Sequence, residues 1–145
     1  MRKVLIVVSF VGFNLVFGKL LCLAGEEYFQ AKFISLSDAQ KKWGIAKFDA
    51  ARFKTASTTQ RAPMAVDAVK RRLYVGQDRK KVRGELGEPT GYFFSDTIYA
   101  YQIEEYSESK KEAWQLIFIP DKDLKKVVDV KIHKKCCYET PEWAK

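Results

Sequence analysis

The stretch from Leu73 to Pro89 constrains this chain most, because it contains a complete short helix together with its start and its stop. Asp78 is placed to accept a hydrogen bond from an unpaired backbone N–H of the next turn. Gly87 supplies a residue that tolerates a positive φ where the helix ends, and Pro89 cannot continue the helix. The sequence therefore predicts a helix over residues 79–86, preceded by a tight turn.

A second helix is predicted just before this turn. Val66, Val69 and Leu73 recur at three- and four-residue spacing, which is the period of one helix face. Pro63 fits the first turn of that helix, where its missing N–H costs no hydrogen bond. We therefore expect two helices joined by the glycine turn at Gly76.

Three segments with the two-residue period of β-strands follow, at Thr97–Ile103, Ala113–Ile119 and Lys126–His133, and Gly91–Phe94 is a candidate lead-in strand. Short loops connect the three segments, so consecutive strands should pair antiparallel. The alternation places Tyr99, Tyr101 and Ile103 on one face of the first segment, and Trp114, Leu116 and Phe118 on one face of the second. In the third segment, Val128, Val130 and Ile132 are expected to point inward. The predicted fold class is α+β, with two helices packed on one face of a three-stranded antiparallel meander.

The N-terminus has the layout of a secretory signal peptide. A positive start is followed by the apolar run Val4–Phe17, and small residues at Cys22 and Ala24 allow cleavage after Ala24. Two alternatives stay open, an uncleaved membrane anchor and a lipidated Cys22. All three interpretations place the rest of the chain outside the cytoplasmic membrane, in the periplasm or at a membrane of the envelope.

A short helix is predicted ahead of the main domain. Ser37 and Gln40 have the spacing of a capping box, so a helix over Asp38–Trp43 should end at Gly44. A polar run at residues 55–60 follows. The predicted organisation is a leader or anchor over 1–24, a lead-in with short helices over 25–60, a main domain over 61–135 and a tail over 136–145.

The charge of the chain bears on its partners. The formal net charge is +8, and three cations with no acid lie in the leader, which leaves +5 for the exported part. A basic exported domain favours contact with an anionic membrane surface or an acidic envelope protein. Neither nucleic acid nor a small-molecule substrate is expected as a partner.

A family resemblance rests on one spaced signature, Leu-x-x-Gly-x-Ser/Thr-x-x-x-Val-x-x-x-Leu-Gly-x-Pro. The matching residues are Leu73, Gly76, Asp78, Val82, Leu86, Gly87 and Pro89, and a Tyr-rich strand and the pattern Trp114, Leu116, Phe118 follow them. Residues 64–132 thereby resemble small bacterial envelope proteins of the BamE/SmpA type. The resemblance implies the ααβββ fold, an envelope location and an accessory role in outer-membrane protein assembly. The preceding pattern Phe48, Asp49, Phe53, Arg61 and Met64 is similar to the lead-in of an uncharacterised branch.

Two sets of residues are candidates for binding. Seven cations within fourteen residues should form a patch for anionic lipid or a protein partner, or else a solvated helix face. They are Lys70, Arg71, Arg72, Arg79, Lys80, Lys81 and Arg83. The candidate protein-contact aromatics are Tyr92, Tyr99 and Tyr101, and ordinary cross-strand packing is the alternative for each.

Catalytic and metal chemistry find little support in the sequence. His133 is the only histidine, and with Cys136 and Cys137 it offers at most three metal ligands. A solvent-exposed histidine at the end of a strand and a tail cysteine pair without catalytic role are the preferred interpretations, so no catalytic residue, metal or cofactor is expected. The sequence thus favours a non-enzymatic binding or scaffold protein of the envelope. A secreted inhibitor-type or ligand-binding domain is the alternative, and a thiol or metal sensor at Cys136-Cys137 a weaker one.

Overall fold

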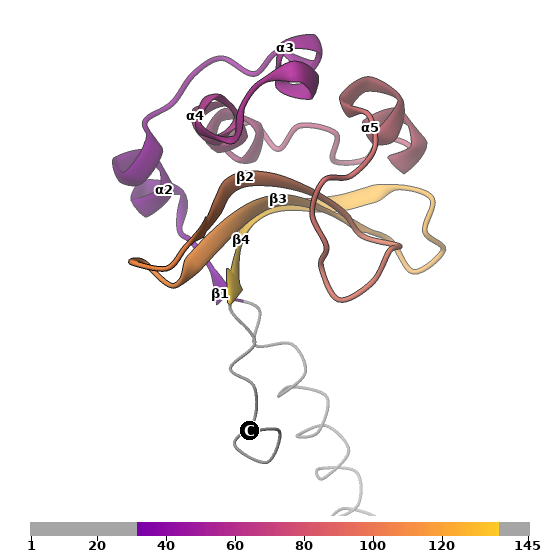
Figure 1. The fold of residues 1–145 in the computed structure, drawn as a ribbon. Coiled ribbons are helices and arrows are strands. Elements are labelled where there is room, and N and C mark those ends of the chain that lie inside the picture. Colours follow the sequence, from indigo (N-terminus) through magenta and orange to yellow (C-terminus); the bar gives the residue numbers. More distant parts are fainter. Residues whose placement is uncertain (1–31, 137–145) are drawn as a thin grey trace, which may run out of the picture. The chain divides into compact units, whose positions relative to one another are not determined.

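Residues 32–136 are described by the computed structural model, which places helices and an antiparallel sheet in this part of the chain (Figure 1). The predictions for the leader, for Cys22 and for the tail from Cys137 onward lie outside the described residues. The side chain of Cys136 also lies outside them, although its backbone belongs to the last strand.

The sheet has four strands, β1 (Lys32–Phe33), β2 (Tyr99–Ser107), β3 (Glu112–Pro120) and β4 (Val127–Cys136). Their order is β1-β4-β3-β2, and every neighbouring pair is antiparallel. The predicted meander is present as β2, β3 and β4. The two-residue strand β1 was not predicted, because a segment this short carries no recognisable period.

In residues 32–136, four helices lie on one side of the sheet, where two were expected (Figure 1). They are α2 (Leu36–Trp43), α3 (Ala50–Thr55), α4 (Thr58–Lys70) and α5 (Arg79–Leu86). The α+β class is therefore correct, and the count of two helices on three strands is too small. The two additional helices come from the predicted lead-in.

Helix α5 spans the predicted residues. The Asp78 carboxylate accepts a hydrogen bond from the backbone N–H of Lys80 at 2.7 Å, and Gly87 has a φ of +81°. The cap of α2 is Ser35 instead of Ser37, since the Ser35 hydroxyl accepts from the N–H of Asp38 at 3.1 Å.

Helix α4 begins earlier than predicted. Ser57 is its N-cap, and the side-chain oxygen of Gln60 accepts from the Ser57 N–H at 3.2 Å, as in a capping box. Pro63 is therefore the sixth residue of the helix and does not lie in its first turn. The polar run at residues 55–60, which ends the predicted lead-in, contains this helix start.

The main core lies between the helices and the sheet. Its largest fully buried side chains include Phe53, Met64, Tyr101 and Phe118. The ring centroid of Tyr101 lies 6.1 Å from that of Phe53 and 6.0 Å from that of Phe118. Because Phe53 belongs to α3, the segment predicted as a lead-in supplies part of this core.

One predicted inward residue of β4 faces outward. Val128 is 47 % exposed, whereas Val127 is buried. The register between β3 and β4 shifts between Ile119 and Pro120, and Pro120 pairs with Val127. An irregularity of this kind inserts a residue into the alternation and exchanges the two faces on one side of it.

The opposite face of the sheet is covered by the loop that connects α5 to β2 (Figure 1). The N–H of Gly91 donates to the carbonyl oxygen of Ala100 at 2.9 Å, and Phe93 is buried. The predicted strand at Gly91–Phe94 is wrong, since Phe93 forms only a local bridge with Ser95. We call residues 88–98 the crossing loop.

Candidate functional site

The predicted cationic patch lies around the turn between α4 and α5, and most of its members have partners within the chain. Arg71 pairs with Asp67 at 3.2 Å, and Lys81 lies 3.7 Å from Glu85. Arg71 and Lys81 line a common cavity of about 260 Å³. The acids beside them offset their charge.

Two further cations of the cluster contact different strands of the sheet. Arg72 lies 3.5 Å from Asp129 in β4, and the guanidinium carbon of Arg79 lies 4.2 Å from the ring centroid of Tyr99. The seven residues therefore do not present seven uncompensated charges.

Arg83 pairs with Glu88 through two contacts, at 2.9 and 2.6 Å. This contact raises the pKa of the Arg83 guanidinium above its usual range. Of the seven cations, Lys70, Arg79 and Lys80 have no ion pair within the part of the chain that the structure describes, and Arg79 instead lies over the Tyr99 ring.

Two of the three candidate contact tyrosines are core residues. Tyr99 and Tyr101 are buried on the helix-facing side of β2, so neither belongs to an exposed aromatic face of the sheet. The Tyr101 hydroxyl donates to the carbonyl oxygen of Gly87 at 2.9 Å, and burial raises the pKa of this phenol above its usual range. Tyr92, in the crossing loop, is 46 % exposed. The helices cover the tyrosine-bearing face, so the expectation of an exposed Tyr-rich sheet face is corrected.

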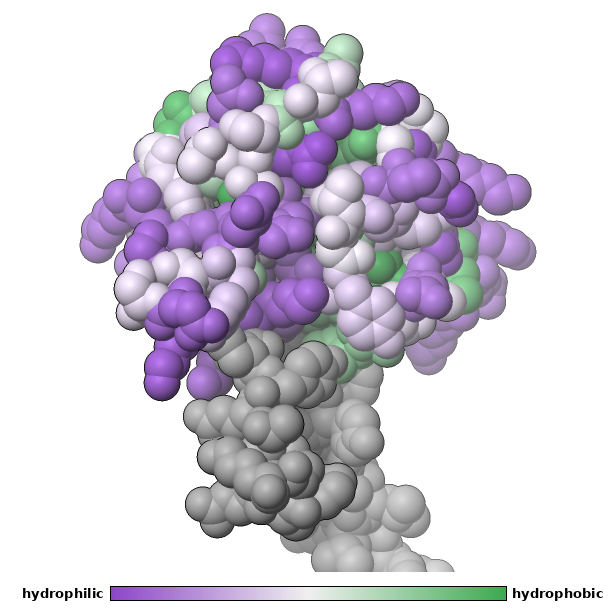
Figure 2. All heavy atoms as spheres, in the orientation of Figure 1, coloured by the Kyte–Doolittle hydropathy of each residue, from purple (hydrophilic) through white to green (hydrophobic). Residues whose placement is uncertain are grey.

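Exposed aromatic side chains gather instead on the face that carries the crossing loop. Phe33 is 41 % exposed and Phe94 is 50 % exposed, and both rings lie close to His133, at 5.8 and 6.1 Å between centroids. Phe93 lies beneath them, 4.6 Å from His133 and 4.8 Å from Phe94. We call Phe33, Tyr92, Phe93 and Phe94, together with His133, the aromatic surface. Figure 2 shows hydrophobic side chains reaching the surface beside the lower end of the crossing loop.

The strand pairing and one close approach hold the aromatic surface in place. Phe33 in β1 is the register partner of His133 in β4, which sets their rings on the same face. A Cβ added at Gly91 would lie 2.6 Å from the side-chain oxygen of Gln115, so the crossing loop approaches β3 closely only because this residue is glycine.

His133 is buried, in contrast to the solvent-exposed histidine that was predicted. Its side chain is covered by the aromatic rings, and burial lowers its pKa to about 4. The Nε2 of Gln115 donates to the carbonyl oxygen of Tyr92 at 2.8 Å and lies 3.1 Å from the Nδ1 of His133. A neutral imidazole accepts at Nδ1 in this arrangement, which joins the loop to β3 and β4.

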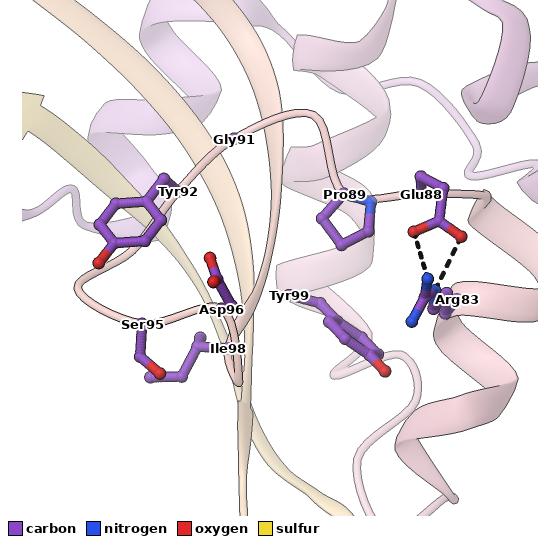
Figure 3. Close-up of a pocket in the computed structure, with 9 residues that line it drawn as sticks. All are labelled: Arg83, Glu88, Pro89, Gly91, Tyr92, Ser95, Asp96, Ile98 and Tyr99. Carbon is purple, nitrogen blue, oxygen red and sulfur yellow. Dashed lines mark hydrogen bonds and ion pairs between the residues drawn. The ribbon is translucent and has the colours of Figure 1, made fainter.

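The crossing loop also encloses a cavity of about 270 Å³ (Figure 3). Pro89 and Tyr92 lie on one arm of the loop, Asp96 on the other, and Tyr99 at the start of β2. The Arg83–Glu88 pair stands at its side. No sequence pattern indicates this cavity, because the two arms of the loop meet only once the loop has folded against the sheet.

The spacing of the signature residues has a structural basis in this chain. Gly76 has a φ of +82°, and its N–H donates to the carbonyl oxygen of Val127 at 2.8 Å. Val82 and Leu86 are buried against the core. Together with the Asp78 cap, these contacts attach α5 and its preceding turn to the sheet.

The lead-in pattern has a comparable basis. Asp49 caps α3 by accepting from the N–H of Arg52 at 2.8 Å, and the Phe48 and Phe53 rings lie 5.3 Å apart. The Arg61 guanidinium donates to the carbonyl oxygen of Phe53 at 2.8 Å and to that of Lys54 at 3.0 Å. Arg61 thereby satisfies carbonyls at the end of α3.

Comparison of the chain with protein-family models, with curated proteins and with solved structures gives no match. The resemblance to BamE/SmpA proteins stays a prediction. Among the side chains described within residues 32–136, no group of histidine, aspartate and glutamate is placed to hold a metal ion. The same range contains no helix with the length and apolar character needed to cross a bilayer.

Proposed function

We propose that this chain is a non-enzymatic binding or scaffold protein of the bacterial envelope, exported by its N-terminal segment, and that it serves as an accessory factor in outer-membrane protein assembly. The envelope location follows from the signal-peptide pattern, and the assembly role follows from the BamE/SmpA-like signature. The partner in this proposal is an envelope protein, and the aromatic surface is the contact site.

The exposed rings of the aromatic surface are the observation that carries the binding role. Phe33 and Phe94 have the aromatic side chains that protein interfaces bury, and they lie on the sheet and on the loop that is hydrogen-bonded to it. The ammonium of Lys131 lies 4.9 Å from the Phe33 ring centroid, which adds a cation at the margin of the surface. Aromatic anchors with a charged rim are typical of protein contacts.

Site-specific photo-crosslinking tests this proposal. A benzophenone amino acid at Phe94 should crosslink to a discrete envelope protein in intact cells, and the crosslink should weaken when Phe33 is changed to Ser. The matched control is the same amino acid at Leu36, which is 38 % exposed and lies in α2. Equal crosslinking from both positions would contradict the assigned surface.

The other interpretations of the sequence give different results in the same experiment. Capture of one extracellular enzyme would support an inhibitor-type function, and phospholipid adducts without protein would indicate a membrane surface as the partner. A second experiment measures binding of the protein to anionic vesicles and tests the cationic residues. Lys70→Glu with Lys80→Glu is the informative variant there, because these two lysines have no ion pair among the described residues.

A further inference from the structure

We propose that the cavity of the crossing loop binds a cationic side chain, a lysine or an arginine, of a protein partner. The inference deepens the proposed function, on which it rests for the partner being a protein. The cavity and the aromatic surface share Tyr92. A partner segment lying on the exposed rings is therefore adjacent to the cavity mouth.

The charged residues that line the cavity leave a net negative charge, because Arg83 and Glu88 pair with each other and Asp96 remains. Arg83 and Glu88 make two parallel contacts, the bidentate geometry in which a guanidinium and a carboxylate neutralise each other. The Asp96 carboxylate has no hydrogen bond or ion pair to any residue that the structure describes. Figure 3 shows Asp96 inside the curve of the loop, between Tyr92 and Tyr99. Asp96 is the group left to attract a cation.

The walls of the cavity suit the rest of such a side chain. Pro89 and Ile98 provide apolar surface for an aliphatic stem, and the half-exposed Tyr92 ring can face the cation. Arg79 packs on the Tyr99 ring and opposes a second cation there. We therefore assign recognition of the cationic side chain to Asp96 and Tyr92, and Tyr99 forms part of the cavity wall.

The size of the cavity favours one side chain over a larger ligand. Pockets for drug-sized molecules have volumes of about 300–1,000 Å³. The volume of about 270 Å³ found here falls below that range. A single arginine or lysine side chain, presented by a partner held elsewhere, fits this space.

Titration of the isotope-labelled protein with a model side chain tests the cavity without any partner. The probe is N-acetyl-L-arginine methylamide, and its neutral isostere, the citrulline derivative, is the control ligand. We expect the amide signals of Tyr92, Asp96 and Tyr99 to shift with a dissociation constant of about 1 mM. The citrulline derivative should bind ~3–5-fold more weakly, as expected for loss of one exposed charge pair.

Two variants complete the test. Asp96→Asn should reduce the affinity for the arginine probe to that for citrulline. Asp123→Asn, which removes the same charge from an exposed position in the β3–β4 connection, should leave it unchanged. No shift up to about 50 mM probe, equal binding of citrulline, or an unaltered Asp96→Asn variant would each overturn the proposal.

The two proposals fail in distinguishable ways. A Phe94 crosslink to an envelope protein, with no probe binding, would leave the aromatic surface as the contact site and remove the cavity. Probe binding with no crosslink would support the cavity as a cation site. It would overturn the proposal that an envelope protein supplies the cationic side chain.

Discussion

The Nε2 of Gln115 lies 3.1 Å from the Nδ1 of His133, and both side chains are buried between the sheet and the crossing loop. The same nitrogen donates to the carbonyl oxygen of Tyr92, so a single amide connects β3, β4 and the loop. The aromatic surface and the cavity therefore depend on a neutral histidine. This dependence makes the stability of the fold sensitive to pH.

Acidification should weaken the fold in a defined range. Burial lowers the pKa of His133 to about 4 from 6.5. The unfolded chain therefore binds more protons between these values, so the stabilisation is complete above about pH 6.5 and is lost as the pH falls through about 4. We expect the free energy of unfolding to fall by on the order of 3 kcal/mol across this range, measured by urea denaturation.

The control for this effect is His133→Gln, which removes the titrating group. Because His133 is the only histidine of the chain, the slope of stability between pH 6.5 and 4 should be smaller in this variant even if it is less stable at pH 7. An unchanged slope would show that carboxylates cause the acid sensitivity.

Two glycines should respond in opposite directions to alanine. Gly84 lies in the exposed middle of α5, with nothing within 4 Å of an added Cβ, so Gly84→Ala should raise the free energy of unfolding by about 0.5–1 kcal/mol. Gly91→Ala should lower it by about 1–2 kcal/mol, because the new Cβ would meet the buried Gln115 side chain at 2.6 Å. Thermal and urea unfolding measure both changes. If Gly91→Ala left the free energy of unfolding unchanged, the crossing loop would not be in close contact with β3 at this position.

Glu112 should stabilise the attachment of α2 to the sheet. Its carboxylate lies 2.7 Å from the ammonium of Lys134 and 2.8 Å from that of Lys42, and these contacts lower the pKa of Glu112 to about 2. The stabilisation is present above the usual pKa of 4.5 and is lost as the pH falls toward 2, below the range of His133.

Glu112→Gln should therefore lower the free energy of unfolding at pH 7 by about 2 kcal/mol, because two partly buried ammonium groups lose their common partner. The control is Glu108→Gln in the exposed β2–β3 turn, which should change stability by less than about 0.5 kcal/mol. Similar losses in both variants would indicate a general charge effect.

Arg61→Lys should weaken the junction of α3 and α4. The guanidinium fork of Arg61 reaches the carbonyl oxygens of both Phe53 and Lys54, and an ammonium cannot reproduce that geometry. We expect a loss of about 1–2 kcal/mol in the free energy of unfolding. Arg52→Lys in the exposed part of α3 is the matched control and should be nearly neutral. If Arg61→Lys left the free energy of unfolding unchanged, a positive charge without the guanidinium geometry would be sufficient to stabilise this junction.

Local chemistry explains why much of the fold was predictable. The bounds of α5 follow from the Asp78 cap and the Gly87 stop, and the strands β2 to β4 follow from alternating side chains, all within a few residues of chain. The start of α4 was predicted too late because Pro63 suggested a first turn, whereas the helix begins at the capping box of Ser57 and Gln60.

The candidate site was less predictable, because its residues come from distant parts of the chain. Phe33, Phe94 and His133 meet only when β1 pairs with β4 and the crossing loop lies on the sheet. The alternation correctly placed Tyr99 and Tyr101 on the same face of their strand, but whether that face is covered depends on helices elsewhere in the sequence.

The sequence by itself determined the local elements, that is, the cap and stop of α5, the alternation of three strands and their antiparallel order. These depend on neighbouring residues and short connections, whose preferences act without the rest of the molecule. Only the tertiary structure decided that the second sheet face is covered by a loop, that His133 is buried and neutral, and that Asp96 is left without a partner among the described residues. Burial and charge compensation are properties of contacts between distant segments, so no local pattern encodes them.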